Sequence, residues 1–137
     1  MNIKIRNEII HQASGGLILE QAWLQYADGP RIRTGNLINL GEKIQLHLVI
    51  QGWEGEQGQI RIGASEKLTT DEGVCFLNEQ DLFAAYDLLP LKAVEKITLS
   101  AVVEKIDRLS DYFKIEFKVY SKLNESQFIE GYYLLHI

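Results

Sequence analysis

The sequence has 137 residues, of which 46% are hydrophobic and 24% are charged, and its formal net charge is −5. This balance predicts one folded domain over residues 1–137 and argues against a disordered chain. The acidic charge excludes a general nucleic-acid binder, and no apolar run is long enough for a membrane-spanning helix.

The N-terminal residues 1–8 lack the apolar stretch and the cleavage site of a secretion signal. If the natural protein begins here, we expect it in the cytoplasm. The lone cysteine, Cys75, cannot form an internal disulfide, which agrees with a reducing compartment.

Two segments in the first third of the chain have the pattern of strands. Residues 3–9 alternate between apolar and charged side chains, which predicts a short amphipathic strand. Residues 17–26 predict a second strand, whose apolar phase changes partway along. A β-bulge, or a strand covered on both sides, would produce this change of phase. The sequence Asp28-Gly29-Pro30 ends the strand as a turn.

Residues 40–68 show the strongest alternation in the chain. A polar, glycine-rich turn at residues 52–58 divides the segment into two halves. Apolar side chains on every second residue indicate strands with one buried face and one wet face. We therefore predict a hairpin of two antiparallel strands, around which the other strands are arranged. Its apolar positions are Ile44, Leu46, Leu48, Ile50, Ile60, Ile62 and Ala64.

The only predicted helix covers residues 78–89, after a short strand at residues 74–77. Asn78 is a good N-cap, Asp81 places negative charge near the positive end of the helix dipole, and Pro90 ends the segment. We expect two or three turns that act as a crossover.

The last third of the chain returns to strands. Residues 97–103 alternate, residues 107–111 form the next turn, and residues 112–120 have two distinct faces. The face that we predict to be buried consists of Phe113, Ile115, Phe117 and Val119. Residues 131–137 are apolar on both faces, which predicts either an interior strand or contact with another chain.

Eight or nine strands without alternating helices predict an all-β protein, an antiparallel β-sandwich of about eight strands with one short crossover helix. The order of N-terminal strand, hairpin, crossover and C-terminal meander resembles an immunoglobulin-type sandwich, although the inter-sheet cysteine pair of antibody domains is absent. An up-and-down barrel of the lipocalin sort, with a small molecule inside, is the alternative. The bulky inward side chains, such as Phe113 and Phe117, favour a filled sandwich.

The residues with catalytic or metal-binding chemistry form no recognisable motif. The three histidines, His11, His47 and His136, lack metal-motif spacing, and His47 falls on the polar face of its strand, where we expect solvation. Cys75 lies in an apolar run, so we expect a buried, inert thiol. We predict no catalytic residue, no metal and no cofactor. Acidic residues that could serve as paired carboxylates or calcium ligands are Asp71, Glu72, Asp81 and Asp87, which we interpret as solvated.

The aromatic residues are the best binding candidates. Trp53 lies in the glycine-rich loop, Tyr112 and Tyr120 lie on the outward face of one strand, and Tyr132 lies in the last strand. Exposed aromatic side chains can stack on sugar rings or anchor a protein interface. The simpler interpretation is that Trp53 covers an open end of the sandwich and that the tyrosines pair across strands. We predict a non-catalytic module for protein binding or self-association, with small-molecule or carbohydrate binding as the alternatives.

Overall fold

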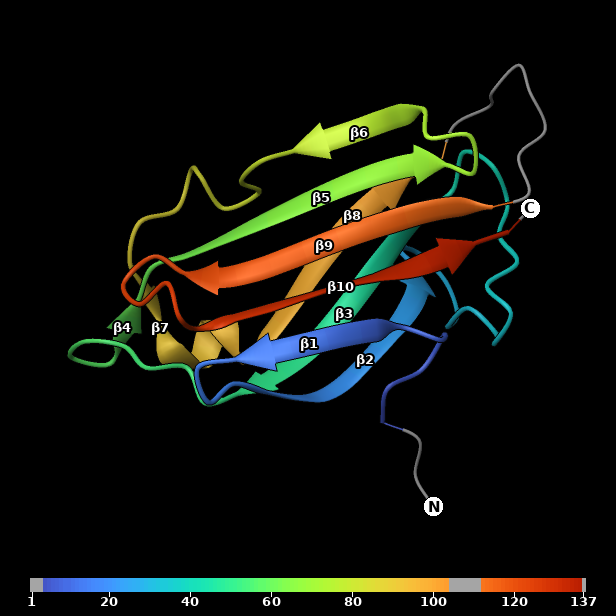
Figure 1. The fold of residues 1–137 in the computed structure, drawn as a ribbon. Coiled ribbons are helices and arrows are strands. Elements are labelled where there is room, and N and C mark those ends of the chain that lie inside the picture. Colours follow the sequence, from blue (N-terminus) through green and yellow to red (C-terminus); the bar gives the residue numbers. More distant parts are fainter. Residues whose placement is uncertain (1–3, 104–111, 137) are drawn as a thin grey trace.

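A computed structural model describes residues 4–103 and 112–136, and most of its regular structure is strand (Figure 1). The strands are β1 (Ile10–Ser14), β2 (Ile18–Tyr26), β3 (Lys43–Gln51), β4 (Gln59–Ile60), β5 (Ile62–Thr70), β6 (Cys75–Glu79), β7 (Leu89–Pro90), β8 (Lys96–Val102), β9 (Phe113–Ser121) and β10 (Phe128–Leu135). The described helix, η1 (Leu91–Val94), is a short 3-10 helix. No helix in the described ranges has the length and apolar character needed to cross a membrane.

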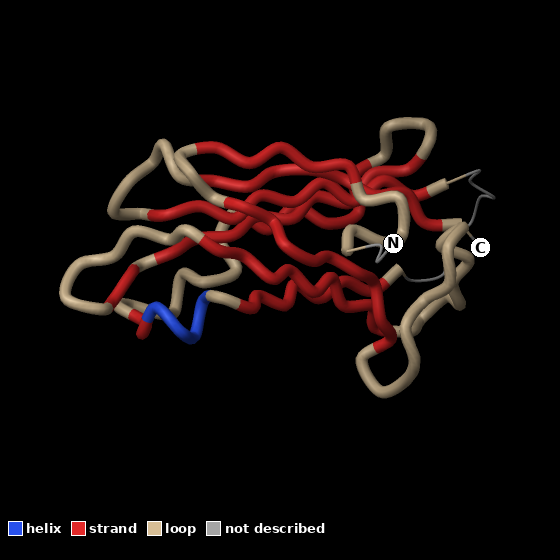
Figure 2. The backbone as a smooth tube through the Cα atoms, turned by 90° about the horizontal axis from the view of Figure 1, so that it is seen from below, coloured by secondary structure: helices blue, strands red, loops and turns tan. Residues whose placement is uncertain are grey.

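The strands form two facing sheets, which confirms the predicted antiparallel sandwich. The large sheet has the order β1-β10-β9-β5-β6, the small sheet has the order β2-β3-β8, and β4 pairs with β7 at one end. The strands of the small sheet cross behind those of the large sheet in Figure 1, and Figure 2 shows η1 at one end of the sandwich. Over the described residues neither sheet closes into a barrel, so the lipocalin-like alternative is wrong.

The core lies between the two sheets and consists of the apolar side of each alternating strand. Burying one Leu or Ile side chain stabilises the fold by about 1.5–3 kcal/mol, so this layer supplies most of the driving force for folding. The inward side chains of β9 are at most 3% exposed, which confirms the face predicted for this strand. The most fully buried apolar residues include Leu24, Ile44, Leu46, Leu48, Ile62, Leu99, Ile115 and Tyr133.

The hairpin predicted over residues 40–68 is wrong. Its two halves, β3 and β5, lie in different sheets: β3 pairs with β2 and β8, whereas β5 pairs with β6 and β9. The loop at residues 52–58 carries the chain from one sheet to the other. Alternation determines which side of a strand is buried, but it does not determine which strand lies beside it.

The helix predicted over residues 78–89 is also wrong. Asn78 belongs to β6, and the described helical turn begins only at Leu91. The Asp81 carboxylate, expected at a helix N-terminus, instead accepts a hydrogen bond from the backbone of Ala64 in β5 at 3.3 Å. The same oxygen accepts a hydrogen bond from the Phe83 N–H at 2.9 Å, so this carboxylate joins a local turn to the neighbouring strand and does not begin a helix.

The strand predicted over residues 3–9 does not form in the described part of that range. Ile5 makes only an isolated parallel bridge to Ala22, and β1 begins later, at residue 10. Asn7 and Glu8 have φ angles of 60° and 57°, which an extended strand cannot accommodate.

Other strand predictions are confirmed. The change of phase in β2 is a bulge between Leu19 and Gln21, and the strand predicted over residues 97–103 corresponds to β8. The last strand, β10, is an interior strand between β1 and β9, as one of the two interpretations required. The turn predicted at residues 107–111, together with Ile137, lies outside the described residues.

Candidate functional site

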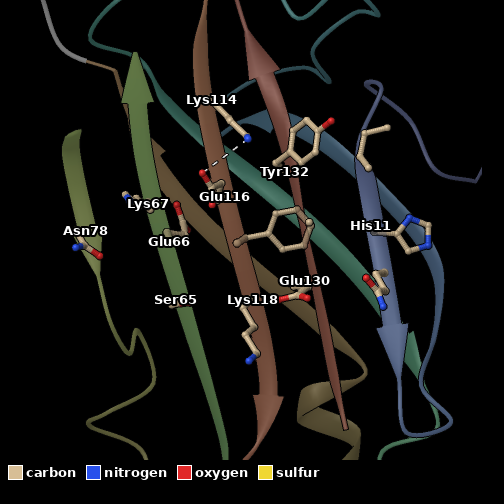
Figure 3. Close-up of a pocket in the computed structure, with 14 residues that line it drawn as sticks. His11, Ser65, Glu66, Lys67, Asn78, Lys114, Glu116, Lys118, Glu130 and Tyr132 are labelled. Atoms are coloured by element: carbon tan, nitrogen blue, oxygen red, sulfur yellow. Dashed lines mark ion pairs between the residues drawn. The ribbon is translucent and has the colours of Figure 1, made fainter. Parts of the chain in front are cut away.

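The outer face of the large sheet carries an open hollow of about 540 Å³ (Figure 3). Its side chains come from all five strands of the sheet, and they combine one tyrosine ring with charged and amide groups. The outward residues that line it include Ile10, Gln12, Lys67, Asn78, Lys114, Glu116, Lys118, Glu130 and Tyr132.

The strand register places opposite charges beside one another across this face. Glu116 in β9 lies opposite Lys67 in β5, and Lys118 in β9 lies opposite Glu130 in β10. Cross-strand pairs of opposite charge stabilise a sheet by a few tenths of a kcal/mol each. Along β9 itself, the Lys114 ammonium lies 3.9 Å from the Glu116 carboxylate (Figure 3). The hollow therefore carries charges of both signs and is close to electrically balanced.

Lysine side chains also lie over the aromatic rings of this face. The Lys114 Nζ is 4.5 Å from the ring centroid of Tyr132, and the Lys118 Nζ is 4.8 Å from that of Phe128 and 5.8 Å from that of Tyr120. Such cation–π contacts are worth about 0.5–1 kcal/mol at exposed sites. They favour the positions in which the rings lie against the lysine side chains.

The structure separates the four aromatic residues singled out from the sequence. Tyr132 lines the hollow, and Tyr120 shares the same outer face, where its ring covers Gly63. Tyr112 precedes β9, is partly exposed and does not line the hollow. The indole N–H of Trp53 donates to the carbonyl oxygen of Val94 at 3.0 Å, and its ring packs against the core. Trp53 therefore covers one end of the sandwich, as its simpler interpretation stated.

Sequence reasoning missed most of the polar residues around the hollow. The alternation of β9 did indicate that Lys114, Glu116 and Lys118 point outward. Nothing in the sequence showed that Gln12 and Asn78, from the opposite edge strands β1 and β6, border the same hollow. Only the pairing order of the strands brings them together.

A buried acid lies beneath this face. Glu66 in β5 points to the inner side of the sheet, is 2% exposed, and neither of its carboxylate oxygens has a hydrogen-bond partner among the described residues. Burial, followed by the negative charge of Glu79, raises its pKa to about 8. Glu66 is thus mainly protonated and neutral at pH 7.

The histidine and cysteine predictions need two corrections. His47 is only 8% exposed, because its ring stacks on Trp23 with centroids 5.0 Å apart, so it is not solvated. Cys75 is exposed on the edge strand β6, so the thiol is not buried. The structure does not bring His47 together with the other histidines: within the described ranges, no three His, Cys, Asp or Glu side chains form a group that could hold a metal ion.

Comparison with known proteins indicates the fold alone. No protein-family pattern matches the sequence, and no curated protein matches it either. A solved structure, the C-terminal domain of wzt, is similar with a TM-score of 0.59 and 11% sequence identity, over 96% of this chain and 78% of that one. At so low an identity, the likeness shows a shared β-sandwich and nothing about residues in the site.

Proposed function

We propose that this chain is a non-catalytic binding module that holds an extended polar ligand, such as an oligosaccharide, on the outer face of the large sheet. The observation that carries this proposal is the open hollow beside Tyr132, which combines a positioned ring with amide and carboxylate groups. Its volume of about 540 Å³ falls in the range of ligand sites, roughly 300–1,000 Å³.

The chemistry of the hollow favours a hydroxyl-rich ligand over an apolar one. Amide and carboxylate side chains such as Gln12, Asn78 and Glu130 can each exchange hydrogen bonds with hydroxyl groups. Charges of both signs alternate across the face, so no strong field selects an anion or a cation. The fold shared with the C-terminal domain of wzt supports the scaffold only, and the ligand class rests on the side chains of this chain.

The test is binding of wild-type protein to a glycan array, followed by titration of the best ligand. Removing the ring in Tyr132→Ala should weaken binding about tenfold, since aromatic contacts contribute on the order of 1 kcal/mol beyond their buried area. The matched control is Tyr86→Ala, which removes a tyrosine that is 54% exposed and lies outside the hollow. Absence of any glycan signal, or equal weakening by both variants, would contradict the proposal.

Self-association is a second candidate, and the edge strand β1 favours it. β1 ends the large sheet among the described strands, and Ile10 in it is 54% exposed. An exposed edge can pair with the same strand of a second copy and extend the sheet. Sedimentation velocity should then show a dimer that Ile10→Lys weakens. A strict monomer at high concentration would rule this candidate out.

A further inference from the structure

A second hollow, of about 480 Å³, lies at the free edge of the small sheet and is lined by three arginines. It is separate from the ligand face proposed above, because it borders β2 of the small sheet, whereas that face belongs to the large sheet. Its lining residues are Arg6, Asn7, Arg31, Ile32, Arg33 and Thr34.

Two short segments bring the arginines together along the edge of β2. The Arg6 N–H donates to the carbonyl oxygen of Ala22 at 2.8 Å, and the Ile32 N–H donates to that of Leu24 at 2.9 Å. Both segments thus continue the sheet beyond β2, although neither is a regular strand. Arg31, whose backbone bridges to Gln25, follows the same edge.

A buried pair of asparagines fixes these segments in place. The Asn7 side-chain amide donates to the Ile32 carbonyl oxygen and to the Asn36 side-chain oxygen, each at 2.9 Å, and the Asn36 amide donates back to the Asn7 carbonyl oxygen at 2.7 Å. Asn7 and Asn36 are 3% and 2% exposed, and both have left-handed φ angles. Hydrogen bonds of this kind, made inside the protein, hold the floor of the hollow rigid before any ligand arrives.

The position of Arg31 is fixed by aromatic stacking. Its Cζ lies 4.6 Å from the ring centroid of Trp23, and the Trp23 ring in turn stacks on His47 at an interplanar angle of 13°. A guanidinium that contacts a ring through its central carbon can still offer N–H groups to a ligand.

The charge around this hollow is unbalanced, unlike that of the large sheet. Three of the five arginines in a chain of net charge −5 line it. None of the three forms a described ion pair, and none of the described residues that line the hollow is acidic. The outward positions nearest Trp23 on the small sheet carry amide, hydroxyl, imidazole or ammonium groups: Gln21, Gln25, Gln45, His47, Lys96 and Thr98. The exposed Glu20 lies farther along β2, at the bulge.

We propose that this hollow binds an oxyanion of the phosphate class through Arg6, Arg31 and Arg33. Guanidinium groups bind phosphate oxygens through two parallel N–H bonds, and an anion in a hollow lined by three cations reduces the repulsion between them. The hollow measures about 480 Å³ and is open to solvent, so it can take a phosphoryl group attached to a larger molecule.

The test follows backbone amide signals of the full chain by NMR while inorganic phosphate is added at low ionic strength. Phosphate should shift signals from residues 6–8 and 31–36, and Arg33→Gln should weaken binding at least tenfold. Arg33→Lys, which keeps the charge but loses the fork of N–H donors, should weaken it nearly as much. The matched control is Arg61→Gln, which removes an arginine 3.9 Å from Asp87 elsewhere and should leave the affinity unchanged.

Two further titrations complete the experiment. If a sugar phosphate monoester binds more tightly than inorganic phosphate, the natural ligand is a phosphoryl group on a larger molecule. If inorganic phosphate binds more tightly, the natural ligand is the free ion. Both results support the site. Absence of shifts up to about 10 mM phosphate, or equal weakening by Arg61→Gln, would overturn the proposal. A response to an anionic vesicle or an oligonucleotide, without a response to phosphate, would also overturn it.

Discussion

The two sheets of this sandwich have outer faces of different electrostatic character. On the large sheet, lysines and glutamates alternate across the strands and surround a nearly neutral hollow. On the small sheet, the outward positions near Trp23 lack acids, and arginines gather at the edge. Both faces follow the same rule of alternation. The difference teaches that period-two patterning selects the outward positions, whereas the charges placed there determine what the face can bind.

Glu66 in the large sheet and His47 in the small sheet are both buried, and the two respond to pH in opposite ways. Glu66 lies on the inner side of the large sheet, and burial raises its pKa to about 8. His47 lies on the outer side of the small sheet under Trp23 and Arg31. Burial, followed by the charges of Lys96 and Arg31, lowers its pKa. Both groups favour their neutral form in the folded protein.

Glu66→Gln should have the largest effect. The folded-state pKa of about 8 exceeds the ordinary value of 4.5, so the folded protein loses free energy of unfolding as pH rises from about 4.5 to 8. This loss is about 1.4 kcal/mol per pH unit and reaches about 4 kcal/mol at pH 8. Glutamine does not titrate, so the free energy of unfolding of the variant should rise relative to that of the wild type by about this amount between pH 4.5 and 8. Urea denaturation at several pH values measures the difference, and a difference independent of pH would contradict it.

Asn7→Ala should destabilise the small-sheet edge by about 3 kcal/mol. The change removes the side-chain bonds to Ile32 and Asn36 and the bond that Asn7 accepts from the Leu24 N–H, leaving buried polar groups unpaired. Denaturation by urea gives the free energy of unfolding. The exposed Asn39→Ala is the matched control and should change it by less than about 0.5 kcal/mol. Similar losses in both variants would show that the asparagine pair is unimportant.

Gly131→Ala should cost about 2 kcal/mol on the large sheet. A Cβ at this position would meet the backbone carbonyl of Ile10, so β1 must move away from β10. Hydrogen exchange of the β1 amides should accelerate in the variant. Gly29→Ala, where a Cβ would make only an ordinary contact with Tyr26, serves as the control. Unchanged protection of β1 would show that the sheet absorbs the methyl group.

His47→Gln should have the smallest effect and the opposite pH dependence to Glu66→Gln. Because the folded-state pKa lies below the ordinary 6.5, the unfolded chain binds the proton more tightly. The neutral His47 side chain therefore makes its full contribution to the free energy of unfolding above about pH 6.5. This contribution is lost as the pH falls below that value. The glutamine variant should lack this step in thermal melts between pH 7.5 and 5. An NMR titration that finds an ordinary pKa for His47 would contradict the expectation.

The sequence predicted single strands better than their arrangement. The buried face of β9 and the bulge in β2 followed from local patterns, because side-chain alternation records burial directly. The helix predicted at residues 78–89 is absent, and the Asp81 carboxylate joins a local turn at Phe83 to the adjacent strand β5. The immunoglobulin-like order of elements and the single domain over residues 1–137 stay predictions.

The candidate sites show the same division. Tyr132 and Tyr120 could be singled out from the sequence because aromatic residues at outward strand positions are conspicuous. The arginine hollow could not, since Arg6 lies about 25 residues from Arg31 and Arg33 and meets them only along the edge of β2.

Composition and two-residue periodicity by themselves determined an all-β chain whose strands bury one apolar face, whereas the sheet topology decided for a sandwich over a barrel. Tertiary structure alone decided that β3 and β5 separate into different sheets, that the buried Glu66 carboxyl group has no hydrogen-bond partner among the described residues, and that three arginines share one hollow. The physical reason is range. The burial of alternate side chains can be predicted from residues that are neighbours in the sequence. Strand pairing instead depends on backbone hydrogen bonds between distant segments, and the backbone groups are the same in every strand, so the sequence does not show which strands pair.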